Sequence, residues 1–120
     1  MKIAISAQGV NLDAQTSDVF GRAPTLIFVD TETGVFEALA NPAMTQGGGA
    51  GTSAAQFVLR HGAEAVLAGT FGPNAVDVFE AAGVPAYLTP QGTVRQAMDM
   101  FKSCRLHRVE SPGRAFSPNR

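Results

Sequence analysis

The sequence predicts an α/β domain: a three-layer α/β/α sandwich around a mixed five-stranded sheet. Three observations lead to this fold class. Short apolar or alternating segments typical of strands recur along the chain, helical segments separate the later ones, and a hairpin-type turn joins two of the earlier ones. Strands separated by helices become parallel neighbours in a sheet that helices cover on both faces, whereas a hairpin adds an antiparallel pair.

The N-terminal part of the chain is expected to supply three strands, Lys2–Ala7, Thr25–Asp30 and Val35–Leu39. The first alternates polar and apolar residues and the second is an apolar run, and both patterns are typical of strands. Between them lie a polar loop, Gln8–Thr16, and an irregular link, Ser17–Pro24. The segment Thr31–Gly34 is a hairpin-type turn, so the third strand should return antiparallel to the second.

After a long loop, Asn41–Gly51, helices alternate with strands. The expected helices are Thr52–His61, Pro73–Ala82 and Thr93–Phe101, and the expected strands are Ala65–Ala68 and Pro85–Leu88. Gly62 and Gly83 stand where helix C-caps are expected, and Pro73 suits a first helical turn. Ligands of open α/β sheets bind beyond the carboxyl ends of the strands. The loops expected to border a binding site are Gln8–Thr16, Gly69–Gly72 and Thr89–Gly92.

Composition excludes several classes of protein. The 120 residues suit one domain, and 45% hydrophobic with 16% charged residues is ordinary for a globular chain. A net charge of −1 argues against a nucleic acid or a membrane surface as a partner held by bulk electrostatics. No apolar run approaches the ~20 residues of a membrane span. The single cysteine rules out an internal disulfide and suits the reducing cytoplasm.

A glycine-rich segment, Gly47–Gly51, precedes the helix expected from Thr52. Glycine lets backbone approach a ligand closely, and a helix N-terminus presents free N–H groups to anions. The segment lacks the lysine of a phosphate loop, and Ala54 stands where the dinucleotide fingerprint has its third glycine. An anion-binding loop and a mobile surface loop both remain open from this feature alone.

Several segments in a fixed order resemble the dinitrogenase iron–molybdenum cofactor-binding family, which includes NifX-like carriers. They are Ser6, Gly9 and Leu12, then Phe20-Gly21-Arg22-Ala23, the hairpin ending at Asn41, the glycine loop, Ala65–Gly69 with Gly72 and Ala75, Phe79, Ala82–Pro85, and Gly92–Ala97. The resemblance covers residues 1–107, which we interpret as the domain. Residues 108–120, with Pro112, Gly113 and Pro118, are expected to form a flexible C-terminal tail.

The resemblance implies a fold similar to a ribonuclease H-like sandwich and a binding function without catalysis. It implies a small carrier or chaperone that transiently holds an anionic iron–sulfur or iron–molybdenum-type cofactor, or its precursor, during metallocluster biosynthesis. The partners it implies are the proteins that donate and receive the cluster. Candidate contacts are Arg22, Met44, Gly47, Gly48, Gly49, Gly51, Gly69 and Gly72. Arginine and backbone N–H groups bind anions through charge-assisted hydrogen bonds.

Each candidate also has a structural interpretation. Arg22 could instead close its own loop by pairing with Asp18, and Met44 could simply pack. Cys104 and His107 have the C-x-x-H spacing of two metal ligands, but a metal site needs a third or fourth, and His61 at a helix end is the only other histidine.

The sequence gives little indication of an enzyme. The first strand carries no carboxylate for a Mg²⁺ site, and the Ser, His and Asp residues do not follow the pattern of a catalytic triad convincingly. A nucleotide binder that uses the glycine loop is a third, weaker hypothesis. The main alternative to the carrier is an interaction or regulatory module of the same fold without a bound cluster.

Overall fold

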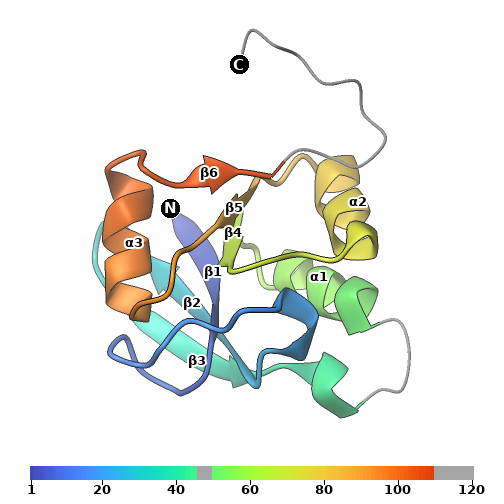
Figure 1. The fold of residues 1–120 in the computed structure, drawn as a ribbon, viewed down its shortest axis with the longest axis horizontal. Coiled ribbons are helices and arrows are strands. Elements are labelled where there is room, and N and C mark those ends of the chain that lie inside the picture. The colour runs from blue at the N-terminus through green and yellow to red at the C-terminus, as the bar shows by residue number, and fades with distance from the viewer. Residues whose placement is uncertain (46–49, 110–120) are drawn as a thin grey trace, which may run out of the picture.

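The computed structural model describes residues 1–45 and 50–109. Within these residues the chain forms one mixed sheet, three α-helices and two short 3₁₀ helices (Figure 1). The strands are β1 (Lys2–Ala7), β2 (Thr25–Asp30), β3 (Phe36–Ala40), β4 (Ala65–Ala68), β5 (Ala86–Leu88) and β6 (His107–Arg108). The helices are η1 (Phe20–Arg22), η2 (Pro42–Thr45), α1 (Ala50–Arg60), α2 (Pro73–Ala82) and α3 (Val94–Lys102).

The strand order in the sheet is β3-β2-β1-β4-β5-β6. Strands β1, β4 and β5 are parallel neighbours. Helix α2 carries the chain from β4 back to the start of β5, and α1 lies in the longer connection that leads to β4. The other three pairs are antiparallel, and β2 and β3 form the hairpin predicted from the turn at residues 31–34. The mixed sheet expected from the sequence is therefore confirmed.

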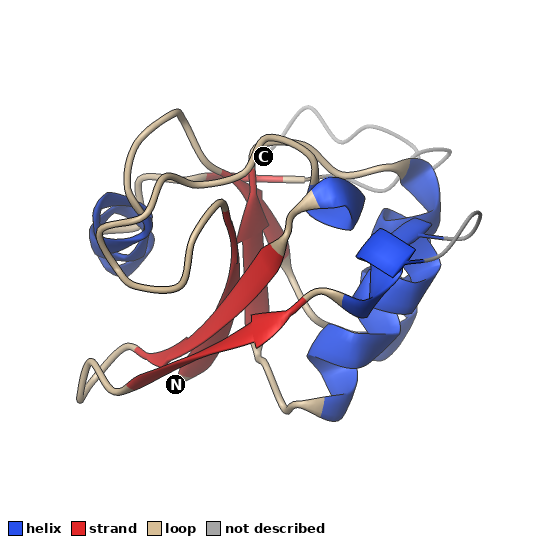
Figure 2. Cartoon of the chain, turned by 90° about the horizontal axis from the view of Figure 1, so that it is seen from below, coloured by secondary structure: helices blue, strands red, loops and turns tan. Residues whose placement is uncertain are grey.

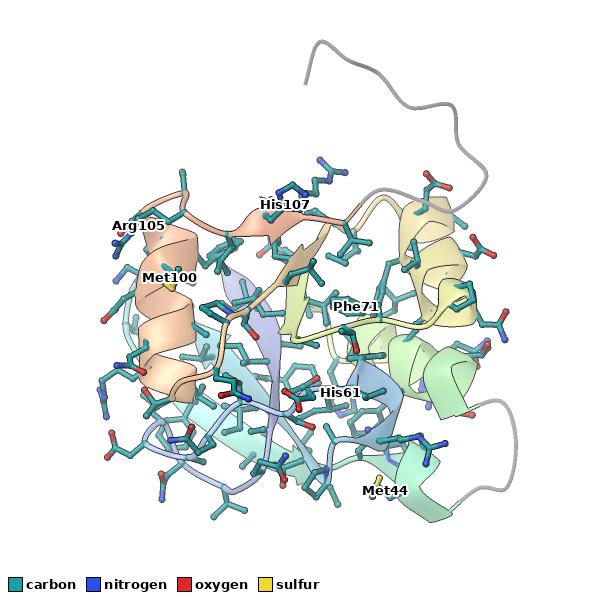
Figure 3. All side chains as sticks on the ribbon, in the orientation of Figure 1. Met44, His61, Phe71, Met100, Arg105 and His107 are labelled. Atoms are coloured by element: carbon teal, nitrogen blue, oxygen red, sulfur yellow. The ribbon has the colours of Figure 1, made fainter. Side chains whose placement is uncertain are left out.

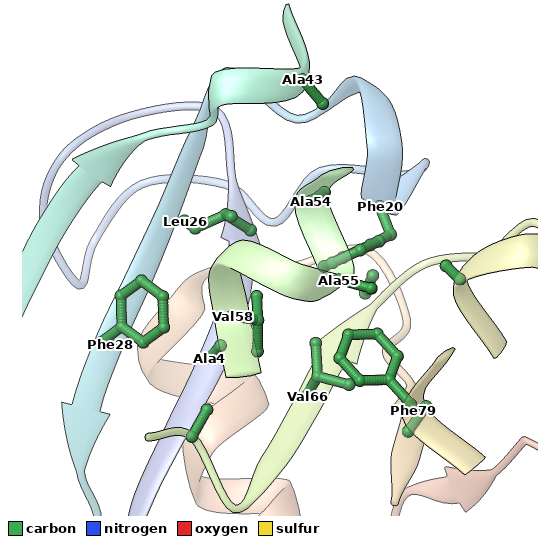
Figure 4. Close-up of a cluster of buried hydrophobic side chains, with 14 residues drawn as sticks. Ala4, Phe20, Leu26, Phe28, Ala43, Ala54, Ala55, Val58, Val66 and Phe79 are labelled. Atoms are coloured by element: carbon green, nitrogen blue, oxygen red, sulfur yellow. The ribbon is translucent and has the colours of Figure 1, made fainter. Parts of the chain in front are cut away.

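Helices cover both faces of the sheet, as the view in Figure 2 shows. On one face, α1 and α2 pack on the sheet through a buried cluster that includes Phe20, Phe28, Val58 and Phe79 (Figure 4). On the other face, α3 packs through a second cluster that includes Val94 and residues of β1, β2 and β4. The alternation of side chains along each strand sends successive residues into the two clusters in turn.

Local signals read from the sequence set the helix ends. Gly83 has a left-handed φ of 74° and donates its N–H to the last turn of α2, the C-cap expected there. Gly62, with φ 78°, follows α1. Helix α3 starts from a capping box: the Thr93 side chain accepts from the Gln96 N–H, and the Gln96 side chain accepts from the Thr93 N–H.

The strand count predicted from the sequence was wrong: the sheet has six strands, not five. The sixth, β6, pairs His107 with Leu88 and Arg108 with Tyr87. Val109 then donates its N–H to Ala86 O at 2.8 Å. The domain boundary predicted at residue 107 therefore falls inside β6, and ordered pairing continues to residue 109. Most of the predicted tail, residues 110–120, lies outside the described residues.

Other element bounds also differ from the expectation: β3, β5 and α3 are each shifted by one residue at one or both ends. The loop predicted over residues 41–51 contains the 3₁₀ helix η2, and α1 begins at Ala50 and not at Thr52. In the part of the chain that the structure describes, no helix combines the length and the apolar character needed to cross a membrane.

Candidate functional site

The carboxyl ends of β1, β4 and β5 meet at one edge of the sheet, because the three strands are parallel and in register. Ala68 at the end of β4 pairs with Leu88 at the end of β5, and Ile5 near the end of β1 pairs with Leu67. The loops that leave these ends are the three expected to border a binding site. The geometry therefore supports a candidate site at this edge, among η1, η2 and the loop at residues 69–72.

The segment after the first loop runs along this edge and closes against the end of β4. Ser17 donates its N–H to Ser6 O at 2.9 Å, and Gly69 donates to Ser17 O at 3.2 Å. Phe20 donates to Thr70 O at 3.0 Å. A Cβ on Gly69 would lie 2.7 Å from the backbone oxygen of Asp18. Asp18 of the chain itself thus fills the space that Gly69 leaves, which is a packing reason for this glycine.

Arg22 lies in η1, two residues after a buried anchor. Phe20 is completely buried, and its ring lies 5.3 Å from Phe71 and 5.4 Å from Phe79. The Arg22 side chain is exposed. Among the described residues, no ion pair or side-chain hydrogen bond joins it to Asp18 or to another group. The pairing with Asp18 that the sequence left open is therefore not seen, and the guanidinium faces solvent at the candidate edge.

Met44 lies in η2, and Asn41 ties η2 to η1. Buried Asn41 donates from Nδ2 to Phe20 O at 3.4 Å and accepts the Ala43 N–H on Oδ1 at 3.0 Å. Both 3₁₀ helices also contact α1. The Met44 side chain is 50% exposed and projects at the rim of the molecule (Figure 3). Asn41 thus holds the turns that carry Arg22 and Met44 next to each other.

The candidate glycines fall into three situations. Gly47, Gly48 and Gly49 lie outside the described residues. Gly51 is in the first turn of α1, where a Cβ would lie 3.5 Å from the Ala75 Cβ of α2, so a small residue suits this helix contact. Gly72 is the exposed N-cap of α2, and a Cβ there would meet nothing within 4 Å.

Cys104 and His107 are both exposed but lie on different faces of the sheet. Cys104 follows α3 and lines a groove of about 550 Å³ with Tyr87 and Phe101, on the face that α3 covers. His107 is directly opposite Leu88 of β5, and Leu88 is directly opposite Ala68 of β4. Residues opposite each other in a sheet lie on the same face, and Ala68 belongs to the cluster under α1 and α2, so His107 lies on that face. Within residues 1–45 and 50–109, no group of three or more His, Cys, Asp or Glu residues is placed to hold a metal ion.

The C-x-x-H pair and the Arg22–Met44 edge are also far apart. Met44 follows β3 at one side of the sheet, whereas His107 belongs to β6 at the other side (Figure 3). The two strands are separated by five strand spacings, about 24 Å at ~4.8 Å each. A cluster in contact with Met44 would therefore lie far from His107.

Two polar residues at the edge are buried, which the sequence did not reveal. The hydroxyls of Ser6 and Thr89 are buried and, among the described residues, have no hydrogen-bond partner. Both lie at the strand ends that form the edge: Ser6 is the last residue but one of β1, and Thr89 follows β5. The sequence pointed to Ser6 through the family resemblance and to Thr89 as the start of a loop at the binding edge, but burial of a hydroxyl is not visible in a local pattern.

What this edge can do chemically follows from its donors. It presents an exposed guanidinium, a soft thioether and backbone at the starts of α1 and α2, the positive ends of the helix dipoles. Such a set suits a large anion held by charge and hydrogen bonds. Its described residues do not include the set of side-chain ligands that a permanently bound metal ion requires.

Comparison with known families gives a match to one of them over residues 1–103. The matching family is described as "Dinitrogenase iron-molybdenum cofactor". Among curated proteins, the chain is 27% identical over 113 residues to an uncharacterised protein from Methanocaldococcus jannaschii, and the match covers 92% of both chains.

Two solved structures are similar along almost their whole length. The apo form of the orange protein from Desulfovibrio gigas is 35% identical, with a TM-score of 0.87 over 94% of this chain and 96% of that one. A NifB-like protein from Thermotoga, assigned to the DUF35 family, is 34% identical, with a TM-score of 0.79 over 94% and 97%.

Proposed function

Because the chain belongs to the dinitrogenase iron–molybdenum cofactor family, we propose that it is a small, non-catalytic carrier of an anionic iron–sulfur cluster. The cluster would be of the iron–molybdenum type or a precursor, held transiently during metallocluster biosynthesis. The observation that carries the proposal is the family match over residues 1–103. The family is associated with cofactor carriers and accessory proteins, and the solved relative from Desulfovibrio gigas is described as an apo form.

The proposed binding edge is the surface of η1 and η2 with the glycine loop that follows. Arg22 supplies a positive charge with no partner among the described residues, and Met44 supplies a soft, exposed side chain. A cluster bordered by sulfides is a large anion, and such anions accept hydrogen bonds from guanidinium and backbone N–H groups. Gly47–Gly49 remain proposed backbone donors, and they lie outside the described residues. Gly51, Gly69 and Gly72 would contribute close backbone approach.

Weak ligation is consistent with a carrier. A protein that receives and passes on a cluster gains from contacts that can be broken, and the described residues offer charge and hydrogen bonds rather than a set of metal ligands. Cys104 and His107, which lie on different faces of the sheet, stay as proposed additional ligands, each for a separate contact away from this edge. The proposed partners are the donor and acceptor proteins of the cluster, in the cytoplasm.

The test is an anaerobic titration of the metal-free protein with an iron–sulfur cofactor, followed by absorption and iron content after desalting. We expect about one cluster retained per chain. Arg22→Ala should weaken binding about tenfold or more, because a hydrogen bond to a charged group contributes about 1.5–3 kcal/mol. The matched control is Arg60→Ala, an exposed arginine at the far end of α1.

Equal binding by the Arg22 and Arg60 variants would remove Arg22 from the site. Loss of the cluster in Cys104→Ala, with binding kept in Arg22→Ala, would move the site to the α3 face. No retention of any cluster tested would overturn the carrier proposal.

The second candidate is an interaction or regulatory module of the same fold. It is favoured by the lack of a ligand group among the described residues. A metal-free protein that retains no cluster and co-purifies stoichiometrically with a partner would support it, and stoichiometric iron in the purified protein would exclude it.

A further inference from the structure

The two outer strands of the sheet differ in how they present their free backbone edge. At one side, β6 has two residues, and both His107 and Arg108 are exposed and polar. At the other side, β3 has five residues with the sequence FEALA and a single charge, on Glu37. Short length and charge protect an edge strand from pairing with another chain, whereas a longer apolar edge invites it. Of the two described outer strands, only β3 combines this greater length with a mostly apolar sequence.

Exposed apolar side chains at the start of β3 make this edge still more apolar. Val35 is 70% exposed and Phe36 is 39% exposed, although both are large and apolar. The pairing of β3 with β2 runs without a bulge from Val29–Phe36 to Thr25–Ala40. In Figure 1, β3 lies at the lower side of the sheet, and no described strand pairs with its outer edge.

Two hydrogen bonds fix which residues of β3 turn their backbone groups outward. Asp30 donates its N–H to Val35 O at 2.9 Å, and Asn41 donates to Pro24 O at 3.1 Å. In an antiparallel ladder, alternate residues face the partner strand. Residues 35, 37, 39 and 41 therefore face β2, and the N–H and C=O groups of Phe36, Ala38 and Ala40 point away from the sheet.

We propose that this edge pairs with β3 of a second copy of the chain, antiparallel and centred on Ala38. The outward residues are spaced symmetrically about Ala38, so a two-fold axis there places Phe36 opposite Ala40 of the second copy. Each outward N–H of one copy then meets an outward C=O of the other. The two six-stranded sheets join into one continuous sheet.

The side chains fit the same register. On one face, the large Phe36 ring lies over the small Ala40 of the second copy, and Ala38 faces its own symmetry mate. On the other face, Glu37 is opposite Leu39, so no like charges are placed directly across from each other. A one-residue slip would put outward groups opposite inward ones. A two-residue slip would leave one of the three outward residues without an outward partner, so the register centred on Ala38 forms the most hydrogen bonds.

The pairing buries little surface beyond one strand, so the dimer should be weak. Interfaces at the small end of the range belong to transient complexes, and we expect a Kd of about 10 µM to 1 mM. The inference does not depend on cluster binding, since β3 lies outside the proposed contacts of Arg22 and Met44.

Sedimentation equilibrium over a concentration series, with the metal-free full chain, tests the dimer. Phe36→Lys places a charge on the edge, and Ala40→Pro removes an outward donor without touching the bonds to β2. Each should raise the Kd at least about tenfold. Val10→Lys is the matched control, because Val10 is a 65% exposed valine in the first loop. Thermal unfolding of each variant checks that the fold is kept.

Amide hydrogen exchange identifies the surface directly. The N–H groups of Phe36, Ala38 and Ala40 should exchange fast in dilute protein and become protected as concentration rises. Those of Glu37 and Leu39 should be protected throughout, because they bond β2. A chain that stays monomeric to about 1 mM would overturn the proposal. So would a dimer in which the three outward amides still exchange fast, or one that the two β3 variants leave unchanged.

Discussion

Replacing Gly69 with alanine should destabilise the protein strongly, although the change adds one methyl group. A Cβ at this position would lie 2.7 Å from Asp18 O and 2.8 Å from Asp18 Cα, closer than real Cβ contacts. The atoms it meets are backbone, so no side-chain rotation can relieve the overlap. The segment at residues 17–20 would have to move away from the end of β4.

The magnitude follows from what that movement breaks. Gly69 donates to Ser17 O, Thr70 donates to Asp18 O, and Phe20 donates to Thr70 O. Forcing an extra carbon into a packed site costs typically ~1–3 kcal/mol. Each weakened backbone hydrogen bond adds about 0.5–1.5 kcal/mol. We therefore expect Gly69→Ala to lower the free energy of unfolding by about 2–4 kcal/mol.

The assay is urea unfolding followed by circular dichroism, with Gly72→Ala as the matched control. Gly72 is three positions away, but its Cβ would meet nothing within 4 Å and its φ is −73°. Loss of a favourable N-cap glycine and reduced freedom of the unfolded chain offset each other, so the control should change stability by less than about 1 kcal/mol. Equal stability of the two variants would refute the packing argument. A stable Gly69→Ala variant with weakened cluster binding would instead assign Gly69 to the ligand.

Two more substitutions test the anchor of η1 and the hairpin turn. Phe20→Ala should cost about 3–5 kcal/mol in urea unfolding, because the completely buried ring contacts two other phenylalanines, whereas Phe36→Ala, at a 39% exposed ring, should cost much less at monomeric concentrations. Hydrogen bonds from the Glu32 and Thr33 N–H groups, with the nearby N-terminal amine, lower the pKa of Asp30. This stabilisation is present above the pKa of about 3.9 in the unfolded chain and is lost as pH falls through the lower folded value. Stability should therefore fall less between pH 5 and pH 2 in Asp30→Asn than in the wild type, and parallel pH profiles would contradict this.

Much of the fold could be predicted, because its elements have strong local patterns. The strands β1, β2 and β4 and the helix α2 were predicted with the bounds that the structure has. The strands are apolar or alternating segments, and in β2, β4 and α2 a glycine or proline stands next to an end. The strand β6 could not be found in the same way. It has two polar residues and no periodicity, and it forms because β5 leaves a free edge beside it.

The candidate site could be predicted only as a set of residues. The family resemblance pointed to Arg22, Met44 and the glycines, but nothing local showed that Asn41 joins η1 to η2 through Phe20 O. The same limit applies to Cys104 and His107, whose spacing suggested one site and whose side chains lie on different faces of the sheet.

By itself, the sequence determined the class of fold, the bounds of β1, β2, β4 and α2, the glycine C-cap of α2 and the family, because these depend on residue type and spacing over short stretches. The tertiary structure decided which faces and edges meet. Asp18 fills the space beside Gly69, which lies far along the chain, and β3 is left as an open edge with three backbone groups turned outward. These features depend on contacts between distant segments, and the free energy that selects them comes from packing of the whole domain rather than from any local preference.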